Sequence, residues 1–114
     1  MHELSIIANL YEIMEEKARE QGAKKITFVK LQVGILSGVV PDFLETAFGI
    51  FKEDTMASDA TLEIEKVPLK IRCESCGVEK TYNELIYICT ECSSAQIKIL
   101  DGTELILEKM DISL

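Results

Sequence analysis

Cys73-Glu74-Ser75-Cys76 and Cys89-Thr90-Glu91-Cys92 repeat one spacing and contain all four cysteines of this 114-residue chain. Each C-x2-C pair can place two sulfurs on one ion, and two pairs about a dozen residues apart supply a closed tetrahedral site. Iron and a redox dithiol are the alternatives to zinc in such a set. Because four thiolates leave no open position for water, the pattern predicts a structural zinc rather than a catalytic one. The expected ligands are Cys73, Cys76, Cys89 and Cys92.

Two amphipathic helices are predicted before the cysteines. Residues 4–21 repeat apolar side chains at three- and four-residue steps, and Gly22 is suited to end that helix. Pro41 opens the second helix, where proline is tolerated because its missing N–H would have no partner. The aromatic side chains of this helix are expected in the core rather than on a partner-facing surface. They are Phe43, Phe48 and Phe51.

The extended segments lie on both sides of the cysteines. Residues 26–35 alternate apolar and polar side chains, as a half-buried strand does. Residues 61–72 predict a second strand, in which Pro68 indicates a bulge or an edge position. After the cysteines, Asp101-Gly102 is suited to a tight hairpin turn between two further strands.

These elements predict an α+β fold in which a small β-sheet packs with two helices and a four-cysteine zinc-binding module is inserted. The α/β domain is expected to be discontinuous, with residues 1–70 and 97–114. The zinc-binding module is expected at residues 71–96. Strand exchange between two such domains would give a homodimer, which is one candidate assembly.

The composition excludes several classes of protein. The formal net charge is −8, which argues against a protein that binds the phosphate backbone of nucleic acids. No apolar stretch approaches the length of a membrane span, and no basic and apolar leader indicates secretion. Paired cysteines without a secretion signal indicate a cytoplasmic protein that binds metal rather than one with disulfides.

The only histidine is His2. The α-amine of Met1, a deprotonated backbone amide and the His2 imidazole can form fused chelate rings, and nitrogen donors in a plane suit Ni(II) or Cu(II). The alternative is an ordinary chain terminus that happens to carry a histidine. Since no other histidine exists, no internal Cys-His or Ser-His-Asp constellation can form, and an enzyme is not expected.

Three features together resemble the HypA/HybF family of hydrogenase nickel-incorporation proteins. They are the start Met1-His2-Glu3-Leu4-Ser5, the two cysteine pairs, and the ending Gly102-Thr103-Glu104-Leu105-Ile106-Leu107. The resemblance implies a nickel metallochaperone that helps deliver Ni(II) to the large subunit of [NiFe]-hydrogenase, and in some organisms to urease, with a nickel-handling GTPase as partner. It also implies that His2 binds nickel with the Met1 amine and the backbone nitrogens of His2 and Glu3.

The chain departs from that family at three places. Glu74 and Thr90 stand where proline often follows the first cysteine of each pair, and Ser93 stands where glycine is common. An additional histidine near the zinc module, found in some relatives, is missing here. The alternative to a nickel carrier is a zinc-ribbon module that binds other proteins as a scaffold.

Overall fold

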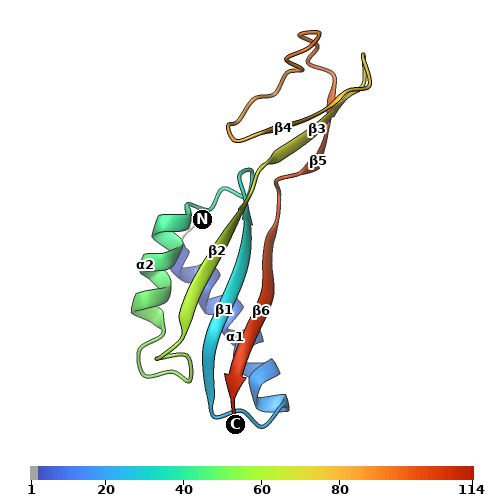
Figure 1. Cartoon of the computed structure of the whole chain (residues 1–114). Helices are drawn as coiled ribbons and strands as arrows, with labels where there is room; N and C mark the ends of the chain where they lie inside the picture. The colour runs from blue at the N-terminus through green and yellow to red at the C-terminus, as the bar shows by residue number, and fades with distance from the viewer. Residues whose placement is uncertain (1–2) are drawn as a thin grey trace.

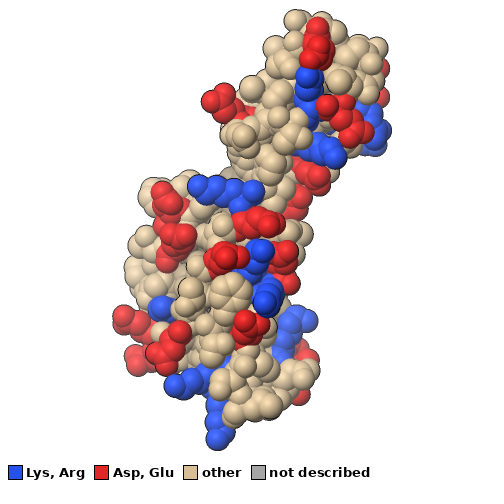
Figure 2. Space-filling model, in the orientation of Figure 1, with Lys and Arg blue, Asp and Glu red and all other residues tan. Residues whose placement is uncertain are grey.

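The computed structural model describes residues 3–114, which form two unequal lobes along one axis (Figures 1 and 2). The principal extents of the molecule are 54 × 24 × 17 Å. The larger, helical lobe contains both helices and one sheet, and the smaller lobe contains a second sheet and the four cysteines. The predicted α+β class is confirmed, with two small sheets where one was expected.

The helical lobe is built on a three-stranded sheet of order β2-β1-β6. The central strand pairs in parallel with β2 and antiparallel with β6, so the first strand of the chain is joined to the last. Both helices contribute buried side chains to one core with this sheet (Figure 1). The elements are α1 (Glu3–Glu20), β1 (Lys25–Gly34), α2 (Pro41–Phe51), β2 (Thr61–Val67) and β6 (Leu105–Ser113).

The two faces of β1 differ as the sequence alternation requires. Val29, Leu31 and Val33 are buried against the helices. Between them, Lys30 points away from the core and forms ion pairs of 3.3–3.7 Å with carboxylates on both neighbouring strands. A period of two therefore separates an apolar layer from a charged one. Acidic and basic side chains are interspersed over the face shown in Figure 2.

The smaller lobe contains the sheet of order β4-β3-β5, in which both pairings are antiparallel. We call this lobe, residues 69–101, the cysteine module. Its strands are β3 (Leu69–Cys73), β4 (Glu79–Tyr82) and β5 (Ile97–Asp101). The division into two domains, residues 1–70 with 97–114 and residues 71–96, remains a prediction. The sheet of the cysteine module begins at Leu69 and ends at Asp101, so it extends beyond residues 71–96 on both sides.

The predicted hairpin at Asp101-Gly102 is wrong. The strand before it pairs with β3 and the strand after it pairs with β1, so the chain leaves one sheet there and enters the other. Pro68 marks the corresponding passage in the opposite direction, between β2 and β3. The proline cannot donate a ladder hydrogen bond, and it therefore lies between the two sheets rather than inside one.

The helix boundaries agree with the sequence. Gly22 adopts a φ of 71°, and the N–H of Ala23 donates to the carbonyl of Ala18 at 3.0 Å, which ends α1.

Neither helix of the described chain combines the length and apolar character needed to span a membrane.

The expectation that all three aromatic residues of α2 lie in the core is wrong for one of them. Phe48 is buried and Phe51 packs against the core, but Phe43 is 61% exposed. It lies in the first turn of α2, where it lines a shallow groove together with Glu3 and Leu4 of α1.

Candidate metal centre

The two cysteine pairs form matching turns. Cys73 ends β3, and its N–H donates to the carbonyl of Val78 while the N–H of Gly77 donates back to the carbonyl of Cys73, at 2.8 and 2.9 Å. The second turn repeats both bonds at 2.8 Å, from Cys89 to Ser94 and from Ser93 to Cys89. We call these turns the first knuckle (residues 73–78) and the second knuckle (residues 89–94).

The knuckles bring all four predicted ligands together. The four sulfur atoms lie within 4.8 Å of one another. Cys73 Sγ is 3.5 Å from Cys92 Sγ, and Cys76 Sγ is 3.7 Å from Cys89 Sγ. Tetrahedral bonds of about 2.3 Å to zinc would separate the sulfurs by about 3.8 Å, so the donor set fits Zn(II). The donors would hold the ion as a closed four-thiolate site with no position for a substrate.

Each knuckle contributes one buried and one exposed cysteine. Cys73 and Cys89 are almost fully buried, whereas Cys76 and Cys92 are exposed. The first cysteine of each pair therefore lies on the inner side of the module. The second faces the surface of the module.

The thiols have different acidities. The N–H of Cys76, at 3.4 Å from Cys73 Sγ, is the main cause that lowers the pKa of Cys73 to about 6. The N–H of Ser94 lowers the pKa of Cys92, but the Cys73 sulfur and partial removal from water outweigh it and raise that pKa to about 12. The Val78 N–H similarly fails to offset partial burial and neighbouring sulfurs, so the pKa of Cys76 is raised. A first thiolate opposes formation of the next, and a divalent ion would remove that opposition.

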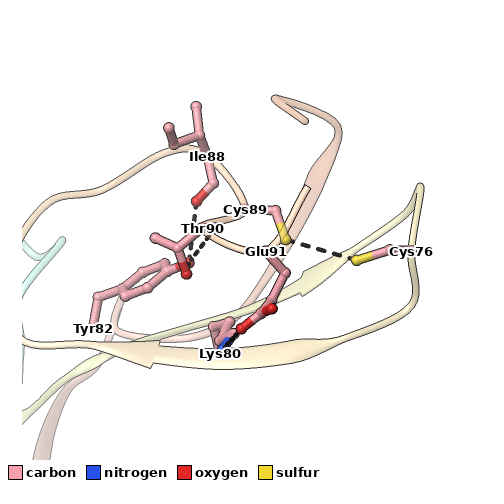
Figure 3. A network of polar contacts seen from close by, with 7 residues as sticks. All are labelled: Cys76, Lys80, Tyr82, Ile88, Cys89, Thr90 and Glu91. Carbon is pink, nitrogen blue, oxygen red and sulfur yellow. Dashed lines mark hydrogen bonds and ion pairs between the residues drawn. The ribbon is translucent and has the colours of Figure 1, made fainter. Parts of the chain in front are cut away.

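A tyrosine that the sequence reasoning missed supports the second knuckle (Figure 3). The hydroxyl of Tyr82, on β4, accepts a hydrogen bond from the Thr90 N–H at 3.2 Å and lies 3.1 Å from the Ile88 carbonyl, to which it can donate. Lys80 on the same strand pairs with Glu91. Alternation along β4 thus places Lys80 and Tyr82 on the side that faces the second knuckle.

Glu74 and Thr90, which stand where proline was expected, both use their backbone N–H as a hydrogen-bond donor. The N–H of Glu74 donates to the carbonyl of Gln96 at 2.8 Å, and the N–H of Thr90 donates to Tyr82. Proline has no N–H and could make neither bond. The third departure, Ser93, adopts a φ of 61°, close to the 78° of Gly77 at the equivalent position.

The nickel ligands expected from the sequence belong to the N-terminus. Met1 and His2 are outside the described residues, and Glu3 is the first residue of α1. A shallow groove of about 290 Å³ borders this end of the helix. Its lining residues are Glu3, Leu4, Phe43, Thr46, Ala47 and Ile50.

Comparison with known proteins gives a consistent result over nearly the whole chain. The family model described as "Hydrogenase/urease nickel incorporation, metallochaperone, hypA" matches residues 1–112. The hydrogenase maturation factor HypA of Aquifex aeolicus is 42% identical over 112 residues, which cover 98% of this chain and 97% of that protein. The HypA of Moorella thermoacetica is 41% identical over 108 residues, covering 95% and 96%.

Solved structures agree. The solution structure of the Ni metallochaperone HypA from Helicobacter pylori has a TM-score of 0.69 at 29% identity, covering 99% of this chain and 98% of that one. A second solution structure of a HypA protein has a TM-score of 0.70 at 30% identity, covering 98% and 96%. The family description names a metallochaperone rather than an enzyme, which agrees with the expectation from the single histidine.

Proposed function

This chain belongs to the HypA family of hydrogenase/urease nickel-incorporation metallochaperones, and we propose that it binds Ni(II) at its N-terminus and helps to deliver it to a nickel enzyme. One observation carries the proposal: the family match begins at residue 1, and the only histidine of the chain stands at position 2. A nickel carrier needs a donor set that can exchange, and this end of the chain offers nitrogen donors of the kind that Ni(II) prefers.

The cysteine module is a poor place for the cargo. Four thiolates around one ion form a closed set, and two of these cysteines are almost fully buried. We assign this site to structural Zn(II) and the transferable metal to the terminus. The ligands of the zinc would be Cys73, Cys76, Cys89 and Cys92.

The nickel donors would be the Met1 amine, the His2 imidazole, and the backbone nitrogens of His2 and Glu3. The start of α1 supports this assignment. The first N–H groups of a helix have no carbonyl partner within the helix, so the nitrogen of Glu3 can lose its proton without breaking a helical hydrogen bond. Ligands of an incoming partner could then replace these donors one at a time.

The family description supports hydrogenase or urease as the client, and we propose the large subunit of [NiFe]-hydrogenase first, because the closely related proteins are named hydrogenase maturation factors. A nickel-handling GTPase is the proposed partner in transfer. The cytoplasm is the proposed location, because cysteines that bind metal instead of forming disulfides are typical of a reducing compartment.

Nickel titration of untagged, zinc-loaded protein tests the proposal. Prior zinc loading keeps nickel away from the cysteines. We expect His2→Ala, and separately a chain extended by residues before Met1, to lose at least tenfold in nickel affinity, because each variant removes one donor from the plane. Ser5→Ala is a matched control on the same terminus and should bind nickel as the parent does.

Unchanged nickel affinity in both variants would overturn the terminal site. If the parent protein also bound no nickel above the level of the control buffer, the scaffold alternative would replace the carrier. Retention of zinc by all variants shows that the module is intact in each comparison.

A further inference from the structure

The two lobes are connected where two segments of chain pass from one sheet to the other beside the end of β1. The outgoing segment is residues 67–69 and the returning segment is residues 101–104. Together with residues 34–36 we call these segments the waist, which Figures 1 and 2 show as the narrow part of the molecule.

The end of β1 is hydrogen-bonded to both passing segments. Gly34 N–H donates to the Glu104 carbonyl at 2.7 Å, and the next residue, Ile35, donates to Val67 at 3.0 Å. Leu36 N–H then donates to the Gly102 carbonyl at 2.7 Å. Three consecutive residues thus fix the outgoing and the returning segment to one another through the backbone.

Two glycines make this contact too close for a side chain. A Cβ on Gly34 would lie 2.1 Å from the Gly102 oxygen and 2.4 Å from its carbonyl carbon, a distance at which backbone must move. Gly102 itself has a φ of 120°, and a Cβ there would meet Leu69 Cα at 3.2 Å. A flexible tether needs no such contact, because loosely connected segments do not press backbone on backbone.

A side chain adds a further bond to the returning segment. The Gly102 N–H donates to Glu104 Oε1 at 2.7 Å. The only donor of Gly102 is therefore held, while its carbonyl accepts from Leu36. Both polar groups of the residue that turns the chain between the sheets are occupied.

We propose that the waist is a rigid joint that fixes the orientation of the cysteine module relative to the helical lobe. The joint makes the two lobes one body, so a partner that binds one lobe is placed in a defined position relative to the other. This property of the waist goes beyond nickel binding and stands independently of the metal that the terminus carries.

Residual dipolar couplings of the zinc-loaded full-length protein test the joint directly. We expect the couplings of the helical lobe and of the cysteine module to fit one common alignment tensor with the same degree of order. Two tensors of different magnitude in the parent protein would overturn the proposal, whatever any variant does.

Gly34→Ala tests the contact that creates the joint. It should leave the secondary structure and zinc content of each lobe in place but give the two lobes different tensors. Gly49→Ala is the matched control, because a Cβ at Gly49 meets nothing within 4 Å and it should keep the common tensor. A folded Gly34→Ala protein with the parental common tensor would contradict the proposal.

Glu104 offers a milder pair of variants if Gly34→Ala does not fold. Glu104→Ala removes the acceptor for Gly102 N–H, whereas Glu104→Gln keeps an oxygen at that position. We expect faster hydrogen exchange at the Gly102 amide and a lower degree of order of the module in Glu104→Ala alone. Equal hydrogen exchange and an equal degree of order in both variants would show that the Glu104 side chain does not contribute to the rigidity of the joint.

Discussion

The first and second knuckles reach the same geometry from different sequences. Both close with the same pair of backbone hydrogen bonds and both place one residue in the left-handed region, at φ values of 78° for Gly77 and 61° for Ser93. The first uses glycine, for which this conformation is permissible, and the second uses serine, for which it is strained. Bringing four sulfurs together therefore requires this turn conformation, and the residue at position 77 or 93 adopts the left-handed φ whether it is glycine or serine.

Support for the knuckles differs as well. The Glu74 N–H of the first donates to a backbone carbonyl of the following segment, whereas the Thr90 N–H of the second depends on the side-chain hydroxyl of Tyr82. A side chain can be removed without changing the backbone, so the second knuckle is the one that point mutation can weaken selectively.

Loss of one cysteine sulfur should have the largest effect on the stability of the module, because both knuckles depend on the same metal ion. In Cys73→Ser we expect loss of bound zinc and a large destabilisation of the cysteine module, because metal binding supplies about 10–16 kcal/mol to the folding of small zinc modules. Zinc content by mass spectrometry and NMR dispersion of the module's amides measure this. The helical lobe should keep its helix signal in circular dichroism, and a Cys73→Ser protein with full zinc would show that the site is held differently.

Proton release should distinguish the inner sulfur of the first knuckle from the outer sulfur of the second. At pH 7 the metal-free protein should hold Cys73 largely as thiolate, with its pKa lowered to about 6, and Cys92 as thiol, with its pKa raised to about 12. The pKa of Cys76 is also raised, so zinc uptake must displace at least the protons of Cys76 and Cys92.

Zinc affinity should therefore rise by at least about a hundredfold per pH unit between pH 7 and 8, because at least two protons leave. Calorimetry in buffers of different ionisation enthalpy gives the proton number. In the metal-free module the stability depends on pH with opposite signs for the Cys73 and the Cys92 thiols. The contribution of Cys73 is present above its ordinary pKa and is lost as the pH falls to about 6, whereas that of Cys92 is present at lower pH and is lost as the pH rises through about 12.

Tyr82→Phe should weaken the second knuckle and spare the first. The change leaves the Thr90 N–H without its acceptor, and losing a hydrogen bond of this kind costs about 1 kcal/mol. The rate of zinc transfer to a chelator and amide exchange at Thr90 measure the effect. Tyr87→Phe is the matched control, because Tyr87 is exposed; equal behaviour of the two variants would rule out the hydroxyl as a support.

An exchange of the two left-handed residues should give the smallest effects, with opposite signs. Gly77→Ser should destabilise the metal-bound module by about 1 kcal/mol, because the added Cβ meets nothing within 4 Å and only the backbone cost of about 1–2 kcal/mol applies. Ser93→Gly should stabilise it by less than about 1 kcal/mol, since glycine also gains freedom in the unfolded chain. Thermal unfolding with excess zinc compares the variants, and the same sign for both would contradict the shared geometry.

Local sequence rules predicted the helices, the central strand and the grouping of the four cysteines, because periodicity and ligand spacing depend on near neighbours. They failed where the partner lies far along the chain. Asp101-Gly102 has the composition of a hairpin turn, but β6 pairs with a strand about eighty residues earlier, and the turn became a passage between sheets.

The support of the second knuckle was also beyond local rules. Tyr82 and Thr90 are separated by a loop, and nothing in the spacing of the cysteines indicates that a tyrosine hydroxyl receives the Thr90 N–H. The substitution of proline by threonine was the available signal, because it restores a backbone donor that must find an acceptor.

The pairing of β6 with β1 has a consequence for the synthesis of this protein. Lys25 is paired with Ser113, so the central strand keeps an open edge on that side until β6 has been synthesised. The cysteine module, whose strands end at Asp101, can close earlier, while β6 is still inside the ribosome. The zinc site can thus form on the nascent chain before the helical lobe is sealed, and any truncation that removes β6 would release a chain with a loaded module and an unprotected sheet edge.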